Sequence, residues 1–345
     1  MSRHWRPLRR GMTLIDLMIG SLIGLFVVAV VGAVFLGSKT TFVAQEATSR
    51  LQENGRFAMD TLATDLRMSG FRGCVGSSAL TNTLATPTAL LYNFAEPLWG
   101  SRYSAGSWSP ALTSPVSGLA PDASGDVLVV RRPSGQAWSL IGEMVDASAT
   151  LPITPTANFL RGDLVMVADC AGAAMLQATN ATPGTSGAIG HVMADAGTLV
   201  PGLASNPLGR VFAHDAQVWR MQTLVYFLAA SVRQTGRRSL WVYRAPVYNG
   251  ETQLTELVSG VDGMAVSYGL DTSADLAADR FSPASGVGNW SQVVSARVEL
   301  LLSASSEAST AKAQPYTFNG STVTPTDRRL RTVMSVLVSL RNAVP

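Results

Sequence analysis

Residues 9–16 read Arg9-Arg10-Gly11-Met12-Thr13-Leu14-Ile15-Asp16, and an uninterrupted apolar run extends behind them from Leu17 to Leu36. The run has 20 residues and contains neither a charge nor a proline. At about 1.5 Å of rise per residue, a helix of this length spans roughly 30 Å, the thickness of a bilayer's hydrocarbon core. Four arginines precede the run, whereas Lys39 is the first basic residue behind it. This asymmetry predicts a cytoplasmic N-terminus and a C-terminal mass on the other side of the membrane.

Asp16 is unusual because it places a carboxylate at the start of an apolar run. A carboxylate inside a membrane segment costs about 2.5–3.5 kcal/mol on insertion scales, so an acidic residue here is a functional candidate. The residue could also lie at the depth of the lipid headgroups, where its charge costs little. The residues alone leave both interpretations open.

The stretch from Gly11 to Ile19 resembles the class III leader junction of type IV pilins and pseudopilins. The resemblance implies that a prepilin peptidase removes residues 1–11 by cutting between Gly11 and Met12, and that the new N-terminus at Met12 is methylated. Asp16 then occupies the fifth mature position, where the family usually carries a glutamate that neutralises the N-terminal amine of a neighbouring subunit. Met12 replaces the commoner phenylalanine. A secretory signal peptide is the rival, but its apolar core would have only about 7–15 residues and end at an A-x-A-like site.

The pairing of Asp16 with an amine has a clear physical basis. An ammonium and a carboxylate attract each other more strongly in lipid than in water, because the local dielectric is low. Asp16 is therefore the candidate assembly carboxylate that selects the axial register between subunits. Gly20 and Gly24 form a small-xxx-small pair that would let another helix approach closely. Glycine is also common in membrane helices, so the pair could merely soften this one.

One long helix is predicted over residues 12–68, with the membrane anchor at about 14–36. Behind the anchor, apolar residues recur on one helical face, namely Val43, Ala47, Leu51, Ala58, Leu62 and Leu66. Charged residues are expected on the solvent-facing sides, namely Glu46, Arg50, Glu53, Arg56, Asp60 and Asp65. Gly70 and Gly73 follow the last periodic residue, where a helix should end.

The remainder of the chain is predicted to be mainly β-structure. Residues 69–216 form a loop-rich region bracketed by the two cysteines, with short strands near 89–94, 126–131 and 164–168. Residues 217–345 predict an antiparallel sheet that starts with a hairpin of 218–228 and 240–244 and continues with strands near 253–257, 264–270, 293–302 and 332–340. Its packed face needs a cover, which the second half of the long helix supplies. The expected fold class is α+β, a long N-terminal helix packed on an antiparallel sheet with a loop-rich elaboration.

Two cysteines, Cys74 and Cys170, follow the anchor and are expected outside the cytoplasm, where disulfides persist. A bridge between them would close a loop of nearly 100 residues and contribute roughly 4–5 kcal/mol in the chain-entropy model. Two buried free thiols are the alternative.

The basic character of the whole sequence is misleading. The chain has 26 lysines and arginines against 23 acidic residues, but four of the arginines lie in the leader. The mature chain is therefore close to −1, and a sequence-wide basic footprint for nucleic acid is absent.

Several segments beyond the leader resemble the minor pilins of the PilW family, namely 50–58 (RLQENGRFA), 65–74, 162–170, 257–264 and 327–342. The resemblance implies a pilin-like fold and a non-catalytic minor pilin that helps to prime type IV pilus assembly and sits in a minor-pilin complex near the fibre tip. It implies a single-pass protein of the inner membrane with a periplasmic C-terminus, which later reaches the fibre. The implied partners are the prepilin peptidase, the inner-membrane assembly platform, the major pilin, other minor pilins and a tip adhesin. Twitching motility is the cellular function that such a pilus implies.

The sequence gives little support for a catalytic site, a metal site or a nucleic-acid interface. His191 and His214 lack a partner pattern and are expected in surface loops, and Gly184–Gly187 is not a G-x-S-x-G elbow. Asp271, Asp275 and Asp279 are spaced four apart rather than two apart around a glycine, so a solvated loop is favoured over a calcium site. The basic clusters at 131–132, 237–238 and 328–331 are expected in solvated turns. No cofactor, metal or nucleic acid is therefore expected.

Two other functions remain open. A minor pseudopilin of a type II secretion system would share the leader, helix and sheet. A membrane-anchored extracytoplasmic binding protein or enzyme would use the helix only as a tether, and it would keep its initiator methionine.

Overall fold

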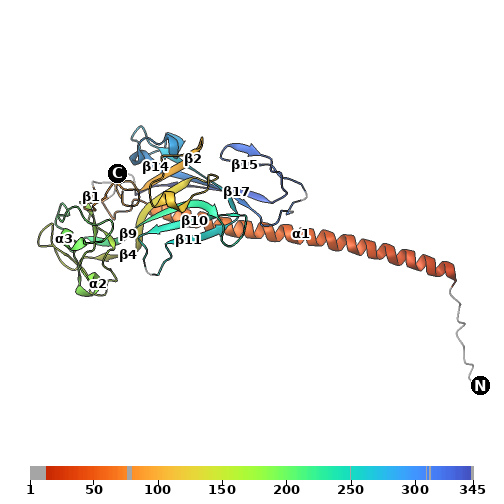
Figure 1. The fold of residues 1–345 in the computed structure, drawn as a ribbon, viewed down its shortest axis with the longest axis horizontal. Helices are drawn as coiled ribbons and strands as arrows, with labels where there is room; N and C mark the ends of the chain where they lie inside the picture. The colour runs from red at the N-terminus through yellow and green to blue at the C-terminus, as the bar shows by residue number, and fades with distance from the viewer. Residues whose placement is uncertain (1–12, 76–79, 249, 308, 311, 343–345) are drawn as a thin grey trace, which may run out of the picture.

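The computed structural model describes residues 13–75, 80–248, 250–307, 309–310 and 312–342. A single long helix, α1 (Leu14–Met68), extends from a β-rich body, and its first half stands free of that body (Figure 1). Its 55 residues correspond to roughly 80 Å of helix. The expected long N-terminal helix is confirmed over these residues.

The larger of two main sheets has nine strands and follows the order β1-β7-β6-β9-β4-β2-β3, with β10 and β11 added beside β9. All of its pairs are antiparallel except β1 with β7. The expected hairpin is present as β9 and β10. The strands are β1 (Leu80–Asn82), β2 (Leu98–Ser104), β3 (Ser107–Ser109), β4 (Val127–Ser139), β6 (Leu164–Ala168), β7 (Ala173–Gln177), β9 (Gln217–Ala230), β10 (Arg238–Ala245) and β11 (Leu254–Ser259).

The second main sheet has four antiparallel strands in the order β13-β12-β14-β17. They are β12 (Val261–Leu270), β13 (Arg280–Pro283), β14 (Val293–Ser303) and β17 (Arg331–Ser339). Two small pairs complete the β-structure, β5 (Leu151–Pro152) with β8 (Ala188–Ile189) and β15 (Tyr316–Phe318) with β16 (Ser321–Val323). The short helices are α2 (Pro183–Ser186), α3 (Met193–Ala196), η1 (Val116–Leu119), η2 (Ala284–Gly286) and η3 (Trp290–Gln292).

The second half of α1 packs into one core that both main sheets share. Leu62 and Leu66 are fully buried there with Tyr226 of the large sheet and Val298 of the small one. Gly55 permits close packing, because a Cβ there would lie 2.3 Å from the Met334 sulfur. The body therefore holds the helix from two sides, and the α+β arrangement expected from the sequence is confirmed.

The loop-rich elaboration has its own apolar core around β6 and β7, which includes Val165, Leu176 and Phe212. α2 and α3 lie in it, at the end of the body far from the free end of α1 (Figure 1). The strand expected near 89–94 is wrong, since this segment forms turns. Backbone carbonyls of this segment accept hydrogen bonds from side chains instead of from a neighbouring strand. Arg72 donates to the Phe94 carbonyl (3.1 Å) and Thr223 donates to the Leu91 carbonyl (2.7 Å).

Candidate assembly interface

The first half of α1 leaves a large apolar surface without a partner inside the chain. Its large apolar side chains between Leu14 and Leu36 are 46–75% exposed. The mean hydropathy there reaches 2.7, and the helix is long and apolar enough to cross a membrane. Soluble monomers rarely expose a contiguous apolar patch of more than a few hundred Å². This surface therefore requires lipid or an apolar surface of another molecule.

Asp16 closes the N-terminal end of this surface through a capping box with Thr13. The backbone N–H of Thr13 donates to Asp16 Oδ2 (3.0 Å), and its hydroxyl donates to the same oxygen (2.7 Å). In return, the Asp16 backbone N–H donates to Thr13 Oγ1 (3.3 Å). Sequence reasoning missed this use of the carboxylate, although a threonine three residues before an acidic residue at a helix start is its known signature. The carboxylate is thereby directed back toward the end of the helix, where residues 1–12 join it.

The two residues of the expected cleavage junction, Gly11 and Met12, lie outside the described residues. Gly20 and Gly24 are described, and a Cβ built on either would meet nothing within 4 Å. Both glycines thus lie on open helix surface that is available for close approach by another helix. Their role in packing between subunits stays a prediction.

Asp65 connects the helix to the body, and its expected position on a solvent-facing side is wrong. The residue is only 6% exposed. Its carboxylate forms an ion pair with Arg132 Nε of β4 at 2.5 Å and accepts a short hydrogen bond from the Tyr226 hydroxyl of β9. Burial, followed by the charge of Asp65, raises the pKa of Tyr226 well above its ordinary value, so the phenol stays a donor. The cluster orients the body on the helix.

The arginine clusters are largely used inside the chain rather than in solvated turns, which corrects the expectation. Arg131 is buried in β4 and donates to the Glu96 carbonyl (2.6 Å), and burial lowers its pKa to about 10. Arg237 donates to the Ala304 carbonyl (2.8 Å). Arg331 forms an ion pair with Asp327 at 2.6 Å. These guanidinium groups therefore hold loops to strands.

The two cysteines form a disulfide, as the sequence led us to expect. Cys74 follows the C-terminal end of α1, and Cys170 lies in the turn between β6 and β7. Next to it, Asp169 forms an ion pair with Arg210 at 3.0 Å. The bridge therefore ties the elaboration to the point where the long helix ends.

The histidines and loop aspartates that the sequence singled out lie in surroundings that point to structural roles. His191 is buried rather than at the surface, and its Nε2 lies 2.8 Å from the Ala149 carbonyl oxygen. Burial lowers the pKa of His191, so the imidazole is neutral near pH 7. His214 is exposed, as expected. Asp271 accepts backbone N–H groups of its own loop, including that of Ala274 (2.6 Å), and Asp279 does the same. Within the described residues, no group of three His, Cys, Asp or Glu is placed to hold a metal ion.

Comparison with known proteins gives a match in the C-terminal part of the body, which packs against the helix. Residues 225–342, from within β9 to just past β17, match one family model. That model describes type IV pilus-assembly protein W, PilW. The resemblance to the PilW family inferred from the sequence is thus confirmed over this stretch. It includes Tyr226, which contacts Asp65, and Met334, which packs against Gly55.

Among solved structures, a type IV-like pilin from Thermus thermophilus is similar to this chain at 12% sequence identity and a TM-score of 0.35. The match covers 86% of this chain and 99% of that pilin. No curated protein matches the chain.

Proposed function

We propose that this chain is a minor pilin that helps to prime assembly of a type IV pilus and is retained in a minor-pilin complex near the fibre tip. One observation carries the proposal. The chain that matches PilW in its C-terminal part also presents an unpartnered apolar rod, and Asp65 in the buried half of this rod contacts Tyr226 in that part. A body fixed to one end of an exposed apolar helix is the form that a stackable subunit requires.

In the proposed mechanism, the prepilin peptidase removes residues 1–11 and Met12 is methylated. The apolar half of α1 then leaves the lipid and packs against the helices of other minor pilins and the major pilin on the assembly platform. Within lipid this exchange gains little, because lipid tails are as apolar as the helix. Outside the membrane each Å² of buried apolar surface stabilises the bundle by about 25 cal/mol. Adhesion in the fibre therefore comes from the run Leu17–Leu36.

Asp16 supplies the axial register in this mechanism. Its carboxylate points back along the helix toward the newly formed N-terminus, where the amine of an adjacent subunit would approach. A buried charge that loses its partner costs about 3–5 kcal/mol, which exceeds a hundredfold in subunit affinity. The bonds to Thr13 and a bond to an amine do not exclude each other, because an ionised carboxylate has about four acceptor sites.

Four variants of the full chain test this role in the native host. Asp16→Ala and Asp16→Asn should both permit leader cleavage and reduce incorporation and pilus number, because each removes the charge. Thr13→Val removes the side-chain part of the capping box but keeps the carboxylate, so it should assemble almost normally. Asp60→Ala is the matched control, since it deletes an exposed carboxylate from the other half of the same helix. The proposed role is wrong if Asp16→Asn assembles normally, or if Thr13→Val fails as badly as Asp16→Ala.

A type II secretion pseudopilin is the second candidate, since it would share the leader and the exposed helix. Deleting the gene separates the two: loss of pili and of twitching with intact secretion supports the pilus, and the opposite pattern supports secretion. A tethered enzyme or binding protein would change neither.

A further inference from the structure

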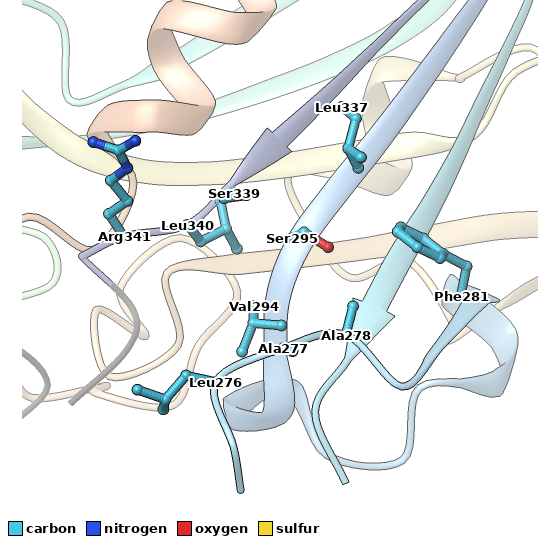
Figure 2. A pocket seen from close by; sticks show the side chains of 10 residues that line it. All are labelled: Leu276, Ala277, Ala278, Phe281, Val294, Ser295, Leu337, Ser339, Leu340 and Arg341. Atoms are coloured by element: carbon cyan, nitrogen blue, oxygen red, sulfur yellow. The ribbon is translucent and has the colours of Figure 1, made fainter. Parts of the chain in front are cut away.

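Two adjoining hollows flank the C-terminal end of β17, far from the free half of α1. One hollow has a volume of about 540 Å³ and lies between β17, β14 and the loop before β13, where Leu276 and Phe281 face it (Figure 2). The other hollow, of about 520 Å³, lies between β17 and the end of α1, where it meets Arg67 and Phe71. The two hollows share Leu337, Ser339 and Arg341, so they form one surface, which we call the β17 groove.

The floor of the β17 groove contains one buried polar group without a partner. Ser295 is only 6% exposed, and its hydroxyl oxygen makes no hydrogen bond to any described residue. Figure 2 shows this oxygen among the side chains of Leu337, Phe281 and Val294. A Cβ on the adjacent Gly269 would lie 2.1 Å from it, so the glycine makes the space. A buried unpaired hydroxyl costs about 1–3 kcal/mol, and a ligand that bonds to it recovers this cost.

The backbone of β17 is also open along the groove. Among the described strands, β17 pairs with β14 alone, on one of its edges. The N–H of Leu340, just past the strand, donates to the Val294 carbonyl of β14 at 2.8 Å. Hydrogen-bonding direction alternates along an antiparallel strand, so the N–H and C=O groups of Leu337 and Ser339 point away from β14. The side chain of Leu337 is 53% exposed beside them. An open strand edge next to an apolar groove is a template for another strand.

The charged side chains that line the groove, Arg67 and Arg341, are both positive. Arg67, Arg280, Arg297 and Arg341 are exposed, and none of them forms an ion pair with a described residue. The guanidinium of Arg297 lies over the Phe281 ring, 4.7 Å from its centroid. The nearby carboxylates of Asp271 and Asp279 are already bonded to N–H groups of their own loop. The groove thus offers uncommitted positive charge around an apolar centre.

We infer that the β17 groove binds an extended, acidic segment of another protein, which adds to the free edge of β17 as a strand. Its backbone would pair with Leu337 and Ser339, and its apolar side chains would pack against Leu337. Its carboxylates would meet Arg341 and Arg297, and one of them would accept a hydrogen bond from the Ser295 hydroxyl. This surface is separate from the helix-mediated contacts proposed above and does not depend on them.

A defined peptide tests the inference with the full chain in detergent micelles. The probe is a fluorescent nine-residue peptide with Val, Glu, Val, Glu, Val at its odd positions and threonine at its even positions. Fluorescence anisotropy should show saturable binding. Binding should be lost for a peptide with lysine in place of glutamate, and for one that is N-methylated at alternate residues and cannot pair along a strand edge.

Variants locate the binding on the chain. Arg341→Glu should weaken binding of the acidic peptide about tenfold, as expected for one charge-assisted contact. Ser295→Ala should weaken it less, whereas Arg233→Glu is the control, because Arg233 is an exposed arginine in the turn after β9. Circular dichroism and melting temperature should match between the Arg341 and Arg233 variants.

Three results would overturn the inference. The first is equal binding of the acidic and lysine peptides, and the second is equal loss of binding in the Arg341 and Arg233 variants. The third is concentration-dependent self-association that Arg341→Glu abolishes while the peptide does not compete, since the groove would then join two copies of this chain.

Discussion

Among single residues, Asp65 makes the polar contact on which the position of the helix depends. Helical periodicity places Asp65 next to Leu66, on the border between the buried and exposed faces, and its charge favoured the exposed interpretation. The decisive partners are distant in sequence: Tyr226 is 161 positions away, and Arg132 lies in another strand. Helical periodicity carries no information about contacts between residues that are distant in sequence. The same limit applies to Arg131 and His191, whose burial depends on loops that fold around them.

Replacing Asp65 should destabilise the whole chain. Asp65→Ala removes the acceptor of the buried Tyr226 hydroxyl and the ion-pair partner of the partly exposed Arg132, so the free energy of unfolding should fall by about 1–3 kcal/mol. Urea denaturation of the detergent-solubilised chain, followed by tryptophan fluorescence, measures the change. Asp60→Ala, at an exposed position on the same helix, should change the free energy by less than about 0.5 kcal/mol. Similar midpoints for the two variants would contradict the role given to Asp65.

Among the secondary-structure elements, the most regular ones were the most predictable. The apolar run and the face through Leu51, Leu62 and Leu66 give a helix whose position follows from its sequence alone. β14 was similarly predictable from the sequence, because its residues alternate between the two faces of its sheet. In the elaboration, the expected strands at 164–168 and 126–131 correspond to β6 and the start of β4. The strand near 89–94 was not predictable, since that segment is held by side-chain bonds such as that from Arg72 to Phe94. The disulfide was anticipated because two cysteines beyond a membrane anchor have few alternatives.

The disulfide should contribute a large share of the stability of the body. Its cysteines are 96 positions apart, so the chain-entropy model assigns it about 4–5 kcal/mol. Cys74→Ser with Cys170→Ser should lower the free energy of unfolding by about that amount, and the reduced parent chain should match the double variant. Denaturation with and without reductant measures both. A double variant as stable as the oxidised parent would contradict this prediction.

As a whole, the molecule is a rod fixed to a two-sheet body (Figure 1). The rod exposes its apolar half, and the body buries the other half between two sheets. In lipid the apolar half of the rod is covered, and outside lipid the proposed bundling of several rods would cover it. Of the candidate interface, the sequence supplied the apolar run, Asp16 and the glycine pair. It did not supply the Thr13 contact or the fixation through Asp65, which depend on side-chain geometry.

We propose that this chain is processed and built into a fibre as a stackable subunit. Intact-mass spectrometry of the protein recovered from sheared pili tests it most directly. We expect a chain that begins at Met12, carries one methyl group on its amine and contains the oxidised cysteine pair. A chain that keeps Met1 and stays with the cell membrane, or one that begins well beyond residue 30, would contradict it.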